Sequence, residues 1–265
     1  MEIRNVKLFP NNNEEAFLVA SELSDKLKKH GYTVVDSNYD LAIAIGGDGS
    51  YLRMVRDNNF NSDVYYIGVN TGTLGFLQEI KPGEVDLFLD RLGKGLYKFD
   101  NVGIQNTRVI ADGVDDSFKS LNEITIRNSK LYKADFRVDV DGALLEHFSG
   151  DGLVVCTTIG STAYNRNLGG AIIYRGFNTL QLTPIAGDSS KAFRSLLSPV
   201  VFPEDTKIEI VPEGGTKDVL IFNDGVECVY EDVRSVETTI CKKKIKCLRM
   251  DDYNYPKIIR EKFLD

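Results

Sequence analysis

Short apolar runs and amphipathic stretches alternate along the first hundred residues. Four runs have the length of strands: Ile3–Phe9, Tyr32–Val35, Leu41–Ile45 and Val64–Val69. Helical spacing joins Ala16, Ala20, Leu23 and Leu27 ahead of Gly31, then covers Tyr51–Asp57, and then joins Val85, Phe88, Leu89 and Leu92 ahead of Gly93-Lys94-Gly95. Strands that alternate with helices are typical of βαβ units around a parallel sheet. We therefore predict a Rossmann-like α/β domain over residues 1–100.

The pattern changes after about residue 100, where alternation replaces helical spacing. Apolar residues at 136, 138 and 140 alternate with polar ones, and Asp141-Gly142 follows as a hairpin turn signal. Further β-like runs cover Lys207–Val211, Val219–Phe222, Val226–Tyr230 and Ser235–Leu248. The pattern predicts a β-rich domain over residues 101–265, arranged like a β-sandwich or barrel. We expect a short helix over Tyr253–Leu264, and this C-terminal segment is a candidate to pack back on the first domain.

Composition narrows the classes of function. Of the 265 residues, 42% are hydrophobic and 27% are charged, as in ordinary globular proteins. The net charge of −7 argues against a protein that binds nucleic-acid backbone. There is no apolar run of about 18 residues, so we expect no membrane partner. The first residues lack the features of a signal peptide, and the expected location is cytoplasmic.

The sequence contains no recognisable zinc-binding, histidine-based or P-loop motif. The cysteines, Cys156, Cys228, Cys241 and Cys247, are scattered, match no common zinc spacing and read as structural thiols. Only two histidines are present, so a histidine-based metal cluster is not expected, and no residue is singled out as a metal ligand. No Gly-x-x-x-x-Gly-Lys-[Ser/Thr] run occurs, which argues against a P-loop.

The most informative motif is Gly46-Gly47-Asp48-Gly49-Ser50, directly after the buried run Leu41–Ile45. Three glycines leave the backbone open to a ligand. The carboxyl ends of strands in open α/β sheets are where ligands bind. Asp48 is therefore a candidate catalytic residue at a phosphate-handling or nucleotide-handling turn. The plainer alternative is a tight turn in which Asp48 only caps the following helix.

Four more polar or glycine-rich segments follow. They are Asn70-Thr71-Gly72-Thr73-Leu74-Gly75-Phe76-Leu77, the pair Asn122-Glu123, Gly150-Asp151-Gly152, and Gly160-Ser161-Thr162-Ala163-Tyr164-Asn165. An amide beside a carboxylate can read the donors and acceptors of a small ligand. Each segment alone can also be explained structurally, as a loop, a surface strand or a helix cap.

Taken in this order and spacing, the five motifs closely resemble the NAD kinase family. The resemblance covers about residues 40 to 225. The first motif also occurs in diacylglycerol, sphingosine and 6-phosphofructo-kinases, whereas Asn122-Glu123 and the tyrosine-containing motif are more specific. The resemblance implies a Rossmann-like domain, a β-rich domain, and transfer of the γ-phosphoryl of ATP to the 2′-hydroxyl of the adenosine ribose of NAD. It also implies Mg²⁺ or another divalent cation on the triphosphate and a homodimer or homotetramer.

The resemblance carries over to individual residues. Asp48 matches the catalytic aspartate, with Gly49 beside it against the ligand. Asn122 and Glu123 match a pair that contacts the adenosine ribose and adenine, and Asp151 matches an acid on the nicotinamide side. The turn around the dinucleotide and two further contact positions correspond to Thr162, Ala163, Tyr164, Asn165, Arg166, Asn167, Ala186 and Asp224.

The chain departs from the family pattern at several positions. Ser50 replaces a threonine, Asn167 a serine, and Cys156-Thr157-Thr158-Ile159 stands where Ser-Thr-Pro-Thr is common. Ser149 falls where some bacterial relatives carry arginine. These departures bear on cofactor affinity and on the choice of donor, including ATP against polyphosphate. Two other functions stay open: a lipid kinase of the diacylglycerol type and a non-catalytic NAD(P)-binding sensor.

Overall fold

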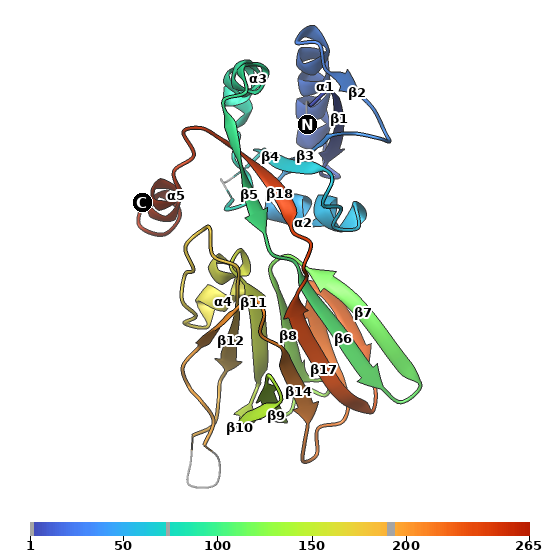
Figure 1. The fold of residues 1–265 in the computed structure, drawn as a ribbon, viewed down its shortest axis with the longest axis vertical. Helices are drawn as coiled ribbons and strands as arrows, with labels where there is room; N and C mark the ends of the chain where they lie inside the picture. The colour runs from blue at the N-terminus through green and yellow to red at the C-terminus, as the bar shows by residue number, and fades with distance from the viewer. Residues whose placement is uncertain (1–2, 73–74, 190–193) are drawn as a thin grey trace. The chain divides into compact units, whose positions relative to one another are not determined.

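The structure is a computed structural model that describes residues 3–72, 75–189 and 194–265 (Figure 1). It divides into two compact units. Unit 1 combines Met1–Val102 with Lys244–Asp265, and unit 2 is the continuous segment Gly103–Lys243. We expected residues 101–265 to form one β-rich domain. Residues 244–265 instead group with unit 1, because the last strand of the chain lies inside its sheet.

Unit 1 is built on a six-stranded sheet with the order β2-β1-β3-β4-β18-β5. Neighbours are parallel except for β18 and β5, which are antiparallel. The strands are β1 (Asn5–Pro10), β2 (Thr33–Val34), β3 (Leu41–Gly46), β4 (Tyr65–Asn70), β5 (Tyr97–Val102) and β18 (Ile245–Met250). The helices are α1 (Glu14–Lys29), α2 (Asp48–Asp57), the 3₁₀ turn η1 (Pro82–Glu84), α3 (Val85–Lys94) and α5 (Tyr255–Phe263). The predicted α/β domain is confirmed.

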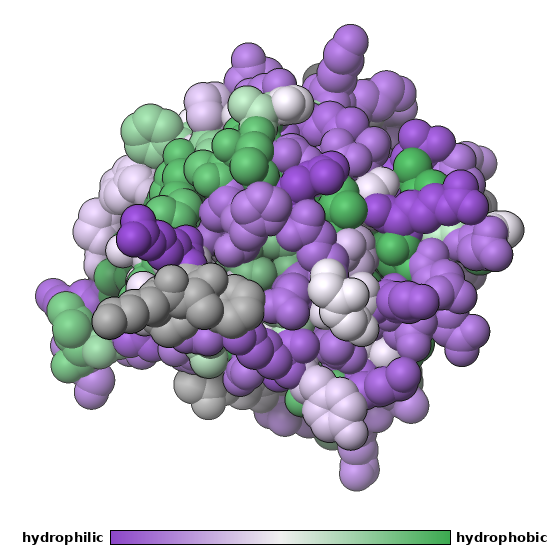
Figure 2. All heavy atoms as spheres, turned by 90° about the horizontal axis from the view of Figure 1, so that it is seen from below, coloured by the Kyte–Doolittle hydropathy of each residue, from purple (hydrophilic) through white to green (hydrophobic). Residues whose placement is uncertain are grey.

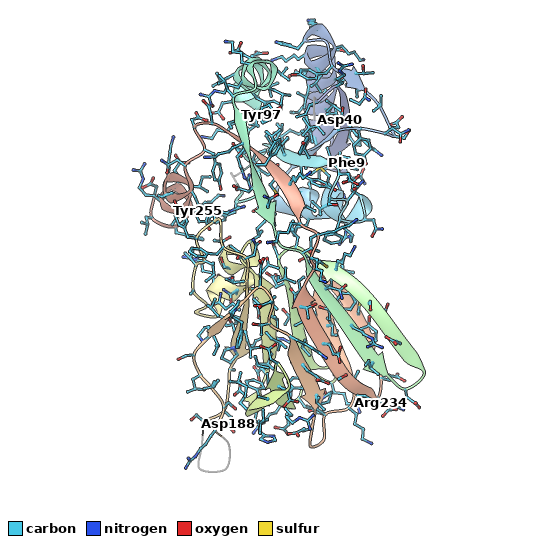
Figure 3. The ribbon with its side chains drawn as sticks, in the orientation of Figure 1. Phe9, Asp40, Tyr97, Asp188, Arg234 and Tyr255 are labelled. Carbon is cyan, nitrogen blue, oxygen red and sulfur yellow. The ribbon has the colours of Figure 1, made fainter. Side chains whose placement is uncertain are left out.

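Local sequence signals explain where these elements begin and end. The side chain of Asn13 accepts a hydrogen bond from the backbone N–H of Ala16, which caps α1. Gly31, with φ +85°, follows the end of that helix as the spacing predicted. At the start of β1, the carboxylate of Asp40 accepts the backbone N–H groups of Arg4 and Asn5, both at 2.8 Å (Figure 3).

A buried ion cluster ties β18 into unit 1. Arg249, with no exposed side-chain surface, pairs through Nη1 with Glu79 and through Nε with Asp100, both at 3.1 Å. Glu79 also accepts the backbone N–H of Met250 at 2.6 Å. Burial raises the pKa of Glu79, and the Arg249 charge opposes that rise. Because removing one partner would leave a buried charge uncompensated, we expect the loss of any one of these side chains to destabilise unit 1.

Unit 2 is a sandwich of two six-stranded antiparallel sheets, ordered β10-β9-β14-β17-β6-β7 and β13-β12-β11-β8-β15-β16. The strands are β6 (Gln105–Ala111), β7 (Val114–Ser120), β8 (Glu123–Asn128), β9 (Ala134–Val140), β10 (Ala143–Gly150), β11 (Gly152–Thr157), β12 (Thr179–Ile185), β13 (Val200–Pro203), β14 (Ile208–Pro212), β15 (Val219–Asn223), β16 (Val226–Tyr230) and β17 (Val233–Ile240). One apolar core takes buried side chains from both sheets, such as Phe136 and Ile126. The predicted β-sandwich-like domain is confirmed.

Two details of the predicted β-rich half can be compared directly. Asp141 and Gly142, with φ +51° and +80°, form the turn between β9 and β10, as predicted. The run Ser235–Leu248 was predicted as one more part of the β-rich half and is wrong in this respect. It contains most of β17 of unit 2 and most of β18, which joins unit 1.

The surface of unit 2 carries several large apolar side chains. Tyr174, Phe177 and Leu197 are each more than half exposed. Figure 2 shows one face of the molecule, on which hydrophobic groups lie among hydrophilic ones. Within the described residues, no helix has both the length and the apolar character needed to cross a membrane.

Candidate active site

Asp48 lies where β3 ends and α2 begins. It is the first residue of α2, after the N-cap Gly47, and its side chain is partly exposed. The two carboxylate oxygens accept separate backbone hydrogen bonds, Oδ2 from the N–H of Phe76 at 2.8 Å and Oδ1 from the N–H of Leu77 at 3.0 Å. A carboxylate has about four acceptor positions, so both oxygens keep capacity for a ligand. Two amide donors fix the orientation of the candidate base.

The carboxylate of Asp48 leaves no room for a side chain at Gly75. A Cβ added at Gly75 would lie 1.8 Å from Oδ1 of Asp48. On the other side of the turn, the side-chain amide of Gln78 donates to the carbonyl oxygen of Gly47 at 2.7 Å. Gln78 is 1% exposed and was not among the predicted site residues. The glycine-rich second motif was the available signal, since it ends one residue before Gln78.

The second motif begins at the end of β4. Asn70 is the last residue of that strand, and its side-chain amide donates to the carbonyl oxygen of Gly72. Thr73 and Leu74, which belong to the same motif, lie outside the described residues. The remaining part, Gly75–Leu77, is the segment that holds Asp48. The two glycine-rich exits from adjacent strands therefore meet at one carboxylate.

In unit 2, the pair Asn122-Glu123 stands at the start of β8, and Asp224 holds it in place. The Asp224 carboxylate accepts the backbone N–H groups of Leu121 at 2.7 Å, Asn122 at 2.8 Å and Glu123 at 3.1 Å. Asp224 itself has φ +45°, in the turn between β15 and β16. This geometry makes Asp224 a brace for the pair.

The side chains of this pair carry polar atoms that lack protein partners. Oδ1 of Asn122 and Oε2 of Glu123 are buried and have no hydrogen-bond partner. Burial, together with the nearby charge of Asp224, raises the pKa of Glu123 to about 8. Glu123 is therefore mainly protonated at neutral pH and offers a hydroxyl donor as well as an acceptor. Orphaned buried polar atoms are costly, and a ligand with hydroxyl or amino groups would satisfy them.

The glycine-serine-threonine motif forms a tight turn against this pair. It comprises the 3₁₀ turn η2 (Gly160–Thr162) and the one-turn helix α4 (Tyr164–Asn167). A Cβ added at Gly160 would lie 2.1 Å from the carbonyl oxygen of Asn122. The same carbonyl accepts the backbone N–H of Thr157 at 2.8 Å. The structure thus brings the predicted turn and the predicted pair together.

Within the turn, side chains differ in what they face. Asn165 is fully buried; its amide donates to the carbonyl oxygen of Ser161 at 3.2 Å, and its Oδ1 accepts the hydroxyl of Thr183 at 2.6 Å. Tyr164 is 37% exposed, and its hydroxyl accepts a hydrogen bond from Arg127 at 3.1 Å. The other members lie at the surface, half-buried at Thr162 and Ala163 and exposed at Arg166 and Asn167.

Asp151 and Ala186 form a separate group. Asp151 is exposed, and its backbone N–H donates to the carbonyl of Ile185 at 2.9 Å. Ala186 follows with φ +45°, and its carbonyl oxygen would lie 2.8 Å from a Cβ added at Gly150. β11 pairs Cys156 with Glu123, so Asp151 lies beyond the opposite end of that strand. At a rise of about 3.3 Å per residue, roughly 16 Å of strand separates the two groups.

Comparisons with known proteins point to one family. The family model for the ATP-NAD kinase N-terminal domain matches residues 6–97, and the model for the ATP-NAD kinase C-terminal domain matches residues 121–250. Among curated relatives, the NAD kinase of Finegoldia magna is 32% identical over 98% of this chain and 97% of its own length. The NAD kinase of Streptococcus pneumoniae is 33% identical over 91% of this chain and 89% of its own.

Two solved structures share the fold. The yeast NADH kinase complexed with NADH superposes with a TM-score of 0.86 at 19% identity, over 98% of this chain and 87% of its own. The NAD kinase from Archaeoglobus fulgidus in complex with ATP gives a TM-score of 0.72 at 21% identity, over 97% of each chain. Both neighbours therefore support the two-unit architecture.

Proposed function

This chain belongs to the NAD kinase family, and from that premise we propose how its residues transfer the γ-phosphoryl group of ATP to NAD. The observation that carries the mechanism is the carboxylate of Asp48, which two backbone amides orient at the end of β3. Phosphoryl transfer needs little covalent help from the protein, and mainly requires positioning and charge stabilisation. An oriented carboxylate at a glycine-rich turn supplies the positioning.

In the proposed step, Asp48 accepts the proton of the adenosine-ribose 2′-hydroxyl. The oxygen that results forms a bond to the γ-phosphorus while the bond from that phosphorus to the bridging oxygen of ADP breaks. The N-terminus of α2, with Gly47 and Gly49 exposed, presents backbone N–H groups that favour phosphate. In unit 2, Asn122 and Glu123 bind the adenosine through the buried oxygens that have no protein partner. We propose Tyr164 as a surface for base stacking and Asp151 as a contact on the nicotinamide side.

We propose Mg²⁺ or another divalent cation as a companion of the triphosphate, where it neutralises charge. Among the described residues, no three histidine, cysteine, aspartate or glutamate side chains gather as a metal cluster. The donor set at the turn is a single carboxylate, which fits an ion held mainly by phosphate oxygens. Replacing ATP by polyphosphate, and NAD by NADH, in the same assay tests donor and acceptor choice.

We also propose a cytoplasmic homodimer or homotetramer that has neither nucleic acid nor membrane as a partner. The four cysteines are all free thiols, which suits a reducing compartment. The net charge of −7 disfavours phosphate backbones as partners. Self-association would bury exposed apolar side chains such as Phe177 and Leu197. Light scattering of the purified protein tests the assembly: a monomer at micromolar concentration would contradict it.

The deciding experiment compares the native protein with Asp48→Asn in NADP formation from NAD, ATP and Mg²⁺. Asparagine keeps the shape but cannot accept the proton, so the rate should fall by roughly 10²–10⁴. Binding of NAD, measured by calorimetry, should persist in the variant because the proposed adenosine contacts lie in unit 2. Turnover that survives the substitution would remove Asp48 from the chemistry. Binding without turnover in both proteins would favour the sensor.

A further inference from the structure

The segment that orients Asp48 is itself held by the C-terminal part of the chain. Phe76 supplies one of the two amides bound to the carboxylate. Its ring lies against the ring of Phe263 in α5, with centroids 5.0 Å apart and planes inclined by 38°. Such aromatic pairs contribute about 0.5–1.5 kcal/mol beyond their buried area. One ring contact thus links the last turn of α5 to the backbone that fixes the candidate base.

The same segment has a second attachment three residues further on. Glu79 pairs with Arg249 and accepts the N–H of Met250, at 3.1 and 2.6 Å. Between the two attachments, Gln78 donates to the carbonyl of Gly47 beside Asp48. The Glu79 end is buried and held by charge-assisted hydrogen bonds, which makes it the stiffer of the two. The position of Phe76 therefore depends on what supports its ring.

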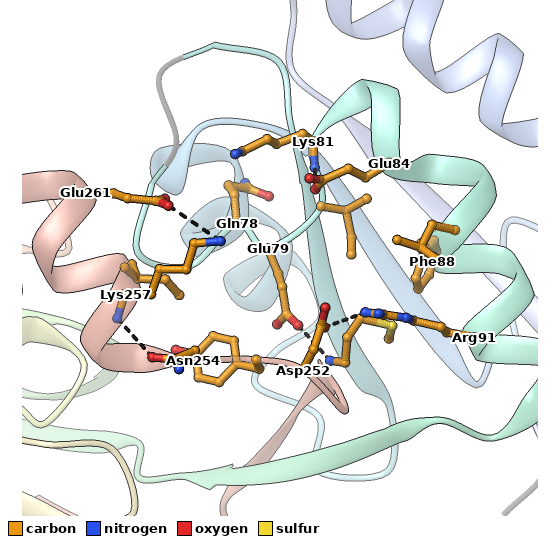
Figure 4. A pocket seen from close by; sticks show the side chains of 15 residues that line it. Gln78, Glu79, Lys81, Glu84, Phe88, Arg91, Asp252, Asn254, Lys257 and Glu261 are labelled. Carbon is orange, nitrogen blue, oxygen red and sulfur yellow. Dashed lines mark hydrogen bonds and ion pairs between the residues drawn. The ribbon is translucent and has the colours of Figure 1, made fainter. Parts of the chain in front are cut away.

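A cavity separates much of α5 from the segment it supports. The cavity holds about 170 Å³ and is lined by residues of the segment Gln78–Lys81, of η1 and α3, of the end of β18 and the segment after it, and of α5. Figure 4 shows Lys257 and Glu261 of α5 on one side and Gln78, Glu79 and Lys81 facing them. Packed side chains do not fill this space. The support that α5 gives to the segment 76–79 therefore depends more on the Phe263–Phe76 contact than it would in a fully packed interface.

We propose that Phe263 is a positioning residue for phosphoryl transfer. Its ring fixes Phe76, so that the Phe76 and Leu77 amides hold the Asp48 carboxylate in its productive orientation. This inference rests on the proposed role of Asp48 as the base. Reactions that depend on positioning lose rate steeply when a group shifts, by as much as about 10²-fold for 1 Å. Loss of the ring should therefore lower kcat and leave substrate affinity unchanged, because Phe263 is not among the proposed ligand contacts.

The test uses the full chain with Phe263→Ala, the milder Phe263→Leu and the control Leu264→Ala. Leu264 follows Phe263 directly and is 79% exposed. We expect kcat to fall on the order of tenfold in Phe263→Ala, with KM for NAD and for ATP within about twofold of native, and Phe263→Leu to recover part of the rate. Leu264→Ala should match the native protein. Thermal unfolding of each variant keeps a loss of folded protein apart from a loss of rate.

A double-substitution cycle with Phe76→Leu and Phe263→Leu gives a second test. It measures kcat in variants that retain an apolar side chain at both positions. If the two rings act on Asp48 through each other, the second substitution should add little to the loss in kcat caused by the first. Fully additive losses, or a Phe263→Ala enzyme with native kcat beside an inactive Asp48→Asn, would overturn this inference alone. An active Asp48→Asn would overturn the proposed base, and this inference with it.

Discussion

Replacing Glu123 by glutamine should stabilise the ligand-free protein at alkaline pH. The carboxyl group is buried beside Asp224, and its pKa is raised to about 8. In the unfolded chain the same group ionises near the ordinary value of 4.5. Between these two values the folded state holds a proton that the unfolded state has lost, so a rise in pH favours unfolding. Glutamine keeps the shape and cannot ionise.

The size of the effect follows from the two pKa values. Each pH unit between 4.5 and about 8 costs the native protein about 1.4 kcal/mol of unfolding free energy. In total, the native protein loses at most roughly 5 kcal/mol of unfolding free energy through this carboxyl. The loss is complete above pH 8 and zero below pH 4.5. The free energy of unfolding of Glu123→Gln minus that of the native protein should therefore rise steadily from pH 5 to 8 and then level off.

Urea unfolding at half-unit steps from pH 5 to 9, without nucleotide, measures this difference. Glu227→Gln is the matched control, since Glu227 is exposed and lies on β16 of the same sheet. The control curve should run parallel to that of the native protein across the range. Parallel curves for Glu123→Gln as well would refute the assignment of a raised pKa to this carboxyl. Calorimetry at neutral pH should show that the variant retains NAD binding, because the glutamine amide offers a donor and an acceptor as the protonated carboxyl does.

Three further substitutions test the packing around the site. Gly75→Ala places a methyl group 1.8 Å from Asp48, and steady-state kinetics should show kcat lowered by roughly 10-fold or more with little change in melting temperature. Gly160→Ala meets the backbone carbonyl of Asn122 at 2.1 Å, and calorimetry should show weaker NAD binding because that backbone must move. Arg249→Met leaves two carboxylates without their buried cation, and urea unfolding should show a loss of about 3–5 kcal/mol.

Matched controls exist for each of these. Gly83→Ala in unit 1 and Gly215→Ala in unit 2 place a methyl group where nothing lies within 4 Å. Arg234 is 70% exposed and pairs with an equally exposed aspartate, so Arg234→Met should cost no more than about 1 kcal/mol. Controls that behave like the test variants would contradict the packing argument.

Local patterns predicted most of unit 1. The run at Leu41 becomes β3, and the glycines after it become the turn that exposes Asp48. The sheet to which β18 belongs was not predicted. Five of the six residues of β18 are buried, and its apolar pattern does not indicate which strands it will pair with. Its parallel neighbour β4 lies about 180 residues away in sequence, and the pairing places Arg249 where Glu79 and Asp100 can compensate its charge.

Some residues of the candidate site were predicted from their residue types, whereas others depend on contacts between segments distant in sequence. The residue types of Asn122 and Glu123 marked them as ligand contacts, and their buried unpaired oxygens support that reading. Gln78 directly follows the second motif, but its own residue type did not mark it, because its importance comes from reaching the carbonyl oxygen of Gly47. Asp224 was predicted as a ligand contact by resemblance, and its oxygens accept three backbone amides. Its role as a ligand contact stays a prediction.

The discontinuity of unit 1 has a consequence for how the polypeptide matures on the ribosome. Unit 2 is a single uninterrupted stretch, so it has all its strands as soon as Lys243 has emerged. The sheet of unit 1 must wait, because in the strand order of the described residues β18 lies between β4 and β5. Until residues 245–250 are synthesised, β5 has no neighbour in its sheet, and the edge of β4 stays open. The nascent chain should therefore complete its β-sandwich before it completes the sheet of unit 1.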